Sequence, residues 1–365
     1  MADTLNAKGK LGDAFTVKGV HVDVTSTSSA DARKKALANG QVRAFNSLLH
    51  RLVTSYQIDS LPPVHLDDVK EYVRDIVIGN EKNSPIRYIA DLTVRFKPRP
   101  TRKLLRDLGI EFAETISKPV LILPIYEIAA AKSLWDNPNP WRDSWKQLTA
   151  LEGLVPIKLP IGDLRDIGLI GAEQAVTGDE QRLSAIAKRY NVETVMVVYA
   201  ALNSEITGKS SIRVNAISYG TDQRASALEN NFSLAQGQSF NELLKQAAHA
   251  TATAIEDRWK EDNIINFEQS AVLAAQVPIK ELADWVEIQR RLKSVAIIER
   301  IDLVLISRSE ARVNIFFLGD PDQLSLALAQ ADMKLEELEG NWLLGFKFQK
   351  KSMLIKALPE VKNQL

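Results

Sequence analysis

Residues 270–346 follow the order strand, helix, strand, strand, helix, strand, and this order constrains the fold more than any other feature of the chain. The elements are a strand at 271–277, a helix at 282–292, β-rich runs at 295–307 and 311–319, a helix beginning at 320, and a hairpin turning at 340–341. Asp320 is expected to cap the second helix, with Pro321 in its first turn. The order is that of the split βαβ, ferredoxin-like plan. We expect its core to contain six apolar residues: Leu273, Val286, Leu292, Ile315, Leu324 and Leu328.

The rest of the chain also mixes strands with helices, so the predicted fold class is α+β with three small domains. A chain of 365 residues is long enough for several cores, and 45% hydrophobic with 25% charged residues is ordinary for a globular protein. The predicted organisation is a flexible arm at 1–13, an N-terminal α+β domain at 14–117, a middle α/β accessory-type domain at 118–265, the ferredoxin-like domain at 266–350 and a tail at 351–365.

The N-terminal domain is predicted to begin with a strand that leads into a long helix. Its expected elements are a strand at 15–24, helices at 28–54 and 66–79, a strand at 87–96 and a short helix at 101–109. Gly19 interrupts the alternation of the first strand, which indicates a β-bulge. Ser28 is expected to cap the long helix. In that helix Ala36, Gly40 and Ala44 form a small-residue face, which would let it lie close to a sheet.

The middle domain is predicted to contain several strongly apolar strands and two capped helices. The expected strands lie at 120–128, 155–159, 192–202, 212–219 and 224–234. Thr177 and Glu180 have capping-box spacing, which predicts a helix that starts there and ends near 190. Ser239 and Glu242 have the same spacing and predict a second, long helix that ends near 262.

The sequence offers no residue set for catalysis or metal binding. It contains no cysteine, which excludes disulfides, thiolate metal sites, iron–sulfur clusters and cysteine nucleophiles. Its four histidines occur in no HxxxH or HExxH pairing, so we expect no metal site. Ser239 lies in a Gly-x-Ser sequence before a helix, but its capping role explains it, and His249 is too far along that helix to activate it. We therefore assign no catalytic residue and expect no cofactor.

One local run of basic residues is a weak candidate for binding phosphate or lipid headgroups. The chain as a whole has 46 basic and 46 acidic residues, so no global field favours nucleic acid. The run consists of Arg95, Lys97, Arg99, Arg102, Lys103 and Arg106. The alternative interpretation is a solvated strand end and helix face, because no aromatic residues interleave with the run as a single-strand binding platform needs.

Three of the six tryptophans lie in one Pro- and Asn-rich segment, and they are the candidate partner-binding residues. They are Trp135, Trp141 and Trp145. Aromatic side chains carry many binding hot spots, and proline limits the entropy that a loop loses on docking. The alternative is that Trp141 and Trp145, at helical spacing, fasten a short helix to the core. A mixed case has Trp135 exposed and the other two buried.

Several motifs resemble an uncharacterised bacterial family, domain of unknown function 2066. The similar motifs are the first strand and helix at 15–52, Tyr88–Phe96, the Trp135–Trp141 segment, Ala283-Asp-Trp285 and Leu318–Leu324. Family members typically carry a secretory signal, so the resemblance implies a location in the cell envelope. This chain shows no such signal, and a periplasmic location therefore requires that the signal has been removed. The resemblance implies no activity and no site residues.

The middle domain is similar in pattern to periplasmic accessory domains of the Tol system, of the curli secretion lipoprotein and of flagellar outer-membrane ring proteins. The similar segments are the strand at 120–125, the stretch at 187–198, and the strand pair that leads into the long helix. Such domains bind partners and assemble, so the resemblance implies binding rather than catalysis.

These observations predict a non-enzymatic periplasmic interaction or assembly protein with envelope protein partners and no transmembrane segment; a homo-oligomer is compatible with them. The alternative is a hydrolase or ligand-processing enzyme with a carboxylate site at a domain interface. A third interpretation is a cytoplasmic protein that binds nucleic acid through the basic run, although we expect no nucleic-acid partner. An exposed apolar loop or edge strand would favour the first interpretation, and perturbed carboxylates converging in a pocket would favour the second.

Overall fold

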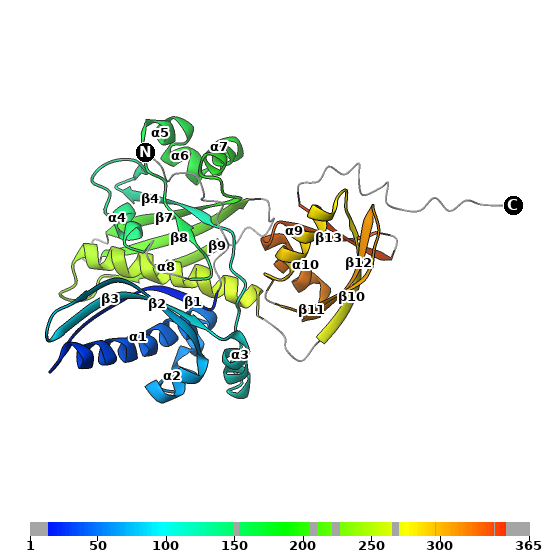
Figure 1. The fold of residues 1–365 in the computed structure, drawn as a ribbon. Helices are drawn as coiled ribbons and strands as arrows, with labels where there is room; N and C mark the ends of the chain where they lie inside the picture. The colour runs from blue at the N-terminus through cyan, green and yellow to red at the C-terminus, as the bar shows by residue number, and fades with distance from the viewer. Residues whose placement is uncertain are drawn as a thin grey trace, which may run out of the picture. The chain divides into compact units, whose positions relative to one another are not determined.

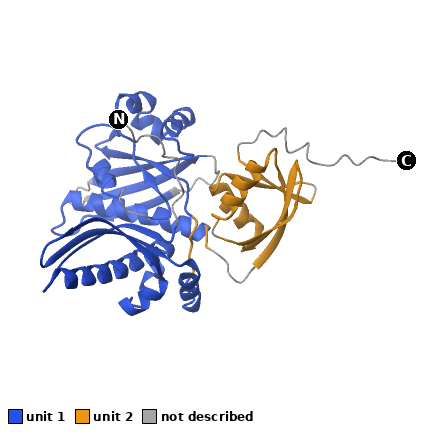
Figure 2. Ribbon diagram, viewed as in Figure 1, with its two compact units in different colours: residues 1–110, 116–262 blue, residues 111–115, 263–365 orange. Residues whose placement is uncertain are grey.

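The computed structural model describes residues 14–148, 153–204, 210–220, 227–264, 270–295, 297–338 and 340–347. The predicted arm at 1–13 and tail at 351–365 lie outside the described residues. Helices and strands in three separate sheets confirm the α+β class. The chain forms two compact units: residues 1–110 and 116–262 make unit 1, and residues 111–115 and 263–365 make unit 2 (Figure 2). The predicted boundary between the N-terminal and middle domains thus falls inside unit 1, where each has its own sheet.

The N-terminal part of unit 1 is a three-stranded antiparallel sheet in the order β1-β3-β2, with α1 packed on one face (Figure 1). Its elements are β1 (Thr16–Thr25), α1 (Ser29–Leu52), the 3-10 helix η1 (Ser55–Ser60), α2 (Leu66–Tyr72), β2 (Val73–Asn83), β3 (Arg87–Phe96) and α3 (Pro98–Asp107). The predicted bulge in β1 is confirmed, because the register with β3 shifts between Val17 and Val20 and Gly19 has φ +63°. A positive φ is a conformation that glycine adopts without steric cost.

Helix α1 lies close to the sheet because of its small-residue face. Ser28 caps the helix as predicted, and its side chain accepts a hydrogen bond from Asp31 N. A Cβ atom placed on Gly40 would lie 2.4 Å from Leu92 Cδ1 and 3.0 Å from Val22 Cγ1. Those distances are shorter than van der Waals contact, so a larger residue at this position would require Leu92 to shift.

The helix predicted at 66–79 is wrong beyond Tyr72. Helix α2 ends there, and Val73 begins β2, which pairs with β3 along its length. The β-branched residues Ile76, Val77 and Ile78 suit a strand better than a helix, and pairing with β3 satisfies their backbone groups. Helix α3 also begins at Pro98, three residues before the predicted start.

The middle part of unit 1 is a six-stranded mixed sheet in the order β5-β4-β7-β8-β9, with β6 beside β4. Its strands are β4 (Val120–Ile128), β5 (Ala131–Ser133), β6 (Ile157–Lys158), β7 (Thr194–Ser204), β8 (Ser210–Gly220) and β9 (Ala227–Ser233). Its helices are α4 (Pro140–Lys146), α5 (Leu164–Leu169), α6 (Ala172–Val176), α7 (Glu180–Tyr190) and α8 (Phe240–Asp262). A hydrophobic core lies on each face of this sheet. Helices α4 and α8 cover one face, and helices α5, α6 and α7 cover the other face (Figure 1).

The caps of helices α7 and α8 agree with the predicted caps only in part. Ser239 and Glu242 form the predicted capping pair at α8, because Ser239 N donates to Glu242 Oε2 (2.8 Å) and Glu242 N donates to Ser239 Oγ (3.3 Å). Thr177 does not cap α7; the side chain of Asp179 does, accepting from Arg182 N. The helix ends as predicted, at the left-handed Asn191.

The C-terminal end of α8 joins the two parts of unit 1. Lys260, which is 5% exposed, donates from Nζ to His50 O (3.0 Å) and Val53 O (2.8 Å) at the end of α1. Asp257 accepts hydrogen bonds from the backbone N (2.8 Å) and the hydroxyl (2.5 Å) of Ser55. A buried ammonium group needs such acceptors, and here the otherwise unpaired carbonyls at the end of a helix supply them.

Unit 2 contains a five-stranded sheet in the order β11-β12-β10-β14-β13. Its elements are β10 (Ser270–Pro278), α9 (Leu282–Leu292), β11 (Ile298–Ile306), β12 (Glu310–Leu318), α10 (Pro321–Gln330), β13 (Met333–Leu338) and β14 (Asn341–Phe346). The first three strands and both helices follow the ferredoxin-like plan. The C-terminal hairpin departs from it, because β14 pairs with β10 in parallel and β13 becomes a fifth, outer strand.

The predicted core of unit 2 is correct at five positions and wrong at one. Val286 is 57% exposed, whereas Trp285, Ile288 and Leu292 face inward from α9. The buried positions 285, 288 and 292 are spaced three and four residues apart and form one face of α9, and Val286 lies outside that face. Asp320 caps α10 as predicted, accepting from Gln323 N at 2.8 Å. Within the described residues, no helix is long and apolar enough to cross a membrane.

Candidate partner-binding surface

Two of the three candidate tryptophans are core residues. Trp141 and Trp145 lie in α4 and have no exposed surface, and their rings pack edge to face at 5.9 Å. Trp141 Nε1 donates to Val198 O at 3.1 Å, which fixes the helix on β7. Asn139 caps α4 by accepting from Arg142 N. The prediction that Trp141 and Trp145 bind a partner is therefore wrong, and the interpretation that they fasten a short helix to the core describes them.

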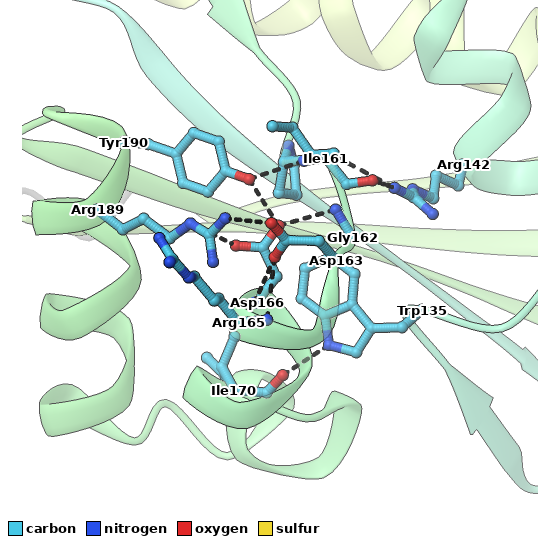
Figure 3. Close-up of polar contacts among 11 residues, drawn as sticks. Trp135, Arg142, Ile161, Gly162, Asp163, Arg165, Asp166, Ile170, Arg189 and Tyr190 are labelled. Carbon is cyan, nitrogen blue, oxygen red and sulfur yellow. Dashed lines mark hydrogen bonds and ion pairs between the residues drawn. The ribbon is translucent and has the colours of Figure 1, made fainter.

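Trp135 is half-buried and braces the neighbouring segment 160–170. Its Nε1 donates to Ile170 O at 2.7 Å, and the guanidinium of Arg142 lies 5.8 Å from the centre of its ring. The same guanidinium donates to Pro160 O (3.2 Å) and Ile161 O (2.5 Å). Figure 3 shows Trp135 and Arg142 together on one side of this segment. The Trp-rich stretch thus holds the start and the end of segment 160–170.

On the other side of the segment, Asp166 is fully buried and holds it to α7. Its Oδ2 accepts from Tyr190 Oη (2.6 Å) and from Gly162 N (2.8 Å). Arg189 Nε lies 3.2 Å from Oδ1, an ion-pair distance without the alignment of a hydrogen bond. Burial, followed by the hydrogen bond to Asp166, raises the pKa of Tyr190. A neutral phenol therefore donates to a buried carboxylate (Figure 3).

Asp163 adds the cap of α5 and a second ion pair. Its Oδ1 accepts from the backbone N of Arg165 and of Asp166, both at 3.0 Å, and its Oδ2 lies 2.6 Å from Arg189 Nη2. The hydrogen bond from Arg189 holds the pKa of Asp163 below its usual value. Arg189 thus links two carboxylates that are three residues apart, and this link fixes the rotation of α5 about its axis.

The result of this bracing is a short helix that presents apolar side chains to solvent. Ile161, Leu164 and Ile167 are 72%, 86% and 48% exposed, and we call them the 161–167 apolar patch. Leu164 and Ile167 lie on one side of α5, while Asp166 and Ile170 on the opposite side are fully buried. A globular helix normally buries its leucine and exposes its carboxylate. Here the arrangement is reversed, and the polar contacts of Asp163 and Asp166 described above hold it in place.

The basic run does not form one cluster. Lys103 pairs with Asp107 (2.5 Å) and Arg95 with Asp75 (3.1 Å), while Lys97 donates to Glu71 O (3.0 Å). The guanidinium of Arg102 lies 5.7 Å from the ring centre of Phe15, and Arg99 and Arg106 are exposed on α3. Acids thus offset the charges of Lys103 and Arg95. Anion binding by this run stays a prediction.

Glu256 of α8 is another carboxylate that holds backbone amides. It accepts from Leu154 N (3.0 Å) and Val155 N (2.8 Å), and burial raises its pKa above the usual value. Its neighbour Lys260 has a lowered pKa for the same reason. Among the residues that the structure describes, no group of three or more His, Cys, Asp or Glu is placed to hold a metal ion.

The residues that build the apolar patch were not identified from the sequence. Leu164, Ile167, Leu169 and Ile170 have the spacing of a buried helical face, which favours the interpretation that all four are core. The sequence signals only the start of the helix, because Asp163 is a suitable N-cap and Asp166 follows in the first turn, where acids are favoured.

Residues 14–114 match the family model of a domain of unknown function, DUF8605. The expectation of an uncharacterised family is thus met for the N-terminal region, but the number of the matched family differs from the one expected. No curated protein matches the chain. The chain is similar in structure to the PelC dodecamer from Paraburkholderia phytofirmans, with 6% identity, over 40% of this chain and 93% of that chain, at a TM-score of 0.26. A likeness at that TM-score carries no argument for this chain. The similarity of the middle domain to periplasmic accessory domains stays a prediction.

Proposed function

We propose that this chain is a non-enzymatic interaction or assembly protein of the cell envelope that binds a partner protein through the 161–167 apolar patch. The observation that carries the proposal is the reversed helix α5, which exposes Leu164 and Ile167 while burying Asp166. Burying a leucine or isoleucine side chain is worth about 1.5–3 kcal/mol, so a fold that braces such residues in solvent forgoes stability. Departures of this kind from local folding rules concentrate at functional sites.

A protein groove fits the patch better than a lipid surface does. The exposed charges within the segment are Asp163 and Arg165, one of each sign, and the whole chain has zero formal net charge. Interfacial helices that bind anionic membranes carry several basic residues on the polar face. Three branched side chains with a rim of mixed charge instead resemble the apolar centre and polar edge of a protein interface. The occupant we propose is therefore an apolar groove on a partner protein.

The roles of the buried carboxylates favour binding over catalysis. Asp166 and Glu256 both accept hydrogen bonds from backbone amides of neighbouring segments, which is a structural use of a carboxylate. The envelope location is supported by the lack of cysteine, which suits an oxidising compartment.

The proposal is tested by site-specific cross-linking in cells that express the full chain. A photoreactive side chain is placed at Leu164 in one variant and at Ile167 in another, and the products are identified by mass spectrometry. We expect both positions to give the same discrete product with one envelope protein, and Ile161→Asp to abolish it.

The control position is Lys146, which is exposed on α4 outside the patch and should give no product with that protein. Two results would identify a membrane, not a protein, as the partner. One is capture of lipid by the probe at Leu164. The other is flotation of the purified chain with anionic vesicles, if Ile161→Asp abolishes that flotation. Products that differ between positions 164 and 167, or that persist in Ile161→Asp, would refute the patch as a docking surface.

A further inference from the structure

Strand β11 of unit 2 is an edge strand with an unusual concentration of exposed apolar side chains. It pairs only with β12 within the described residues, so one row of its N–H and C=O groups faces away from the sheet. Leu303, Val304, Leu305 and Ile306 are consecutive and 40–61% exposed. Edge strands are commonly blunted by lysine, proline or β-bulges. Strand β11 contains neither lysine nor proline, and its two register shifts leave the stretch 300–303 regular. The edge is therefore open to pairing with another strand.

The charges of β11 are arranged so that the strand complements itself. Arg300 and Asp302 lie on the same face and form an ion pair along the strand at 3.2 Å. When two copies run antiparallel with Ile301 opposite Ile301, each Arg300 lies opposite an Asp302. This register is centred on the regular part of the strand. It includes the stretch 300–303, which pairs regularly with β12 between two register shifts.

We propose that β11 pairs antiparallel with β11 of a second copy of this chain and forms a two-fold symmetric dimer. In an isologous interface each patch meets its own copy, so one self-complementary strand is sufficient. Opposite-charge and apolar cross-strand pairs are the interactions that fix the register of such a ladder. This dimer is independent of the 161–167 apolar patch, which belongs to unit 1.

The first test is the mass of the full chain by sedimentation over about a hundredfold range of concentration, because dimerisation follows mass action. We expect a monomer–dimer equilibrium. Val304→Lys, at a position 61% exposed, should leave the fold intact and shift the chain to monomer. The matched control is Val272→Lys, at an exposed position on the open face of β10, which should leave the dimer unchanged.

The second test is a charge exchange. Arg300→Asp or Asp302→Arg alone should raise the dimer Kd about tenfold, because two opposite-charge pairs become like-charge pairs. The double exchange should restore the original Kd. Circular dichroism of each variant checks its fold, since Arg300 also lies 3.9 Å from the ring centre of Phe316. A chain that is monomeric throughout, or a dimer that Val272→Lys disrupts and Val304→Lys does not, would overturn the proposal.

Discussion

Asp166 illustrates how one buried carboxylate determines which side of a short helix faces solvent. Rotating α5 to bury Leu164 would pull Asp166 away from its two hydrogen-bond donors, Tyr190 and Gly162. The same rotation would break the ion pair between Asp166 and Arg189. Leaving a buried carboxylate without its hydrogen-bond donors is costly, and this cost opposes the roughly 1.5–3 kcal/mol that burial of one leucine returns. The exposed position of Leu164 is therefore enforced by polar contacts beneath it.

Glu256 and Glu242 lie on the same helix and are predicted to respond to pH with opposite signs. Burial raises the folded pKa of Glu256 above its ordinary 4.5, so its stabilising contribution is full below pH 4.5 and is lost as pH rises through the folded pKa. The free energy of unfolding of Glu256→Gln should therefore improve relative to the original chain as pH increases. Urea unfolding at a series of pH values measures this difference.

Glu242→Gln is the matched control. The backbone hydrogen bond from Ser239 lowers the pKa of Glu242, so its contribution is present above pH 4.5 and is lost as pH falls through the folded pKa. This variant should lose stability relative to the original chain as pH increases, the reverse of Glu256→Gln. Parallel pH trends in the two variants would contradict the assigned environments.

At the scale of elements, the sequence predicts best those helices and strands whose local signals agree with their tertiary contacts. Helix α1 has a serine cap, a small-residue face and a matching sheet, and β3 alternates cleanly along its length. Strand β2 was mistaken for the continuation of α2, since only pairing with β3 distinguishes the two outcomes. The parallel pairing of β14 with β10 could not be predicted from the sequence either, because no local pattern specifies which strands become neighbours.

The close approach of α1 to its sheet predicts an unusual effect of a glycine substitution. In a helix interior, Gly→Ala usually stabilises by about 1 kcal/mol. Gly40→Ala should instead destabilise by about 1–3 kcal/mol, because the new methyl group overlaps Leu92, which is fully buried and packed among other side chains. Chemical denaturation measures the change. Gly168→Ala in α5, where nothing lies within 4 Å, should show the usual sign, and equal effects at both positions would contradict the packing described.

At the scale of the whole molecule, the two apolar surfaces that we propose as interfaces belong to different units: the 161–167 apolar patch to unit 1 and the edge of β11 to unit 2. The α+β class followed from the sequence, whereas the patch did not. The sequence indicates the tryptophan-rich stretch as a partner-binding surface, whereas Trp141 and Trp145 build the core and Trp135 braces the segment that carries the patch. Composition identifies residues that matter to a fold or a site, and only tertiary contacts separate the two roles.

The most direct test of partner binding through the patch compares two isoleucines of unit 1 with nearly equal exposure. Ile167 in the patch is 48% exposed, and Ile128 at the end of β4 is 47% exposed. The affinity of the cross-linked partner for each purified variant is measured by titration calorimetry. Ile167→Asp should weaken binding by about 2 kcal/mol or more, roughly thirtyfold in Kd, while Ile128→Asp leaves it unchanged. Equal affinities of both variants and the original chain would contradict the account.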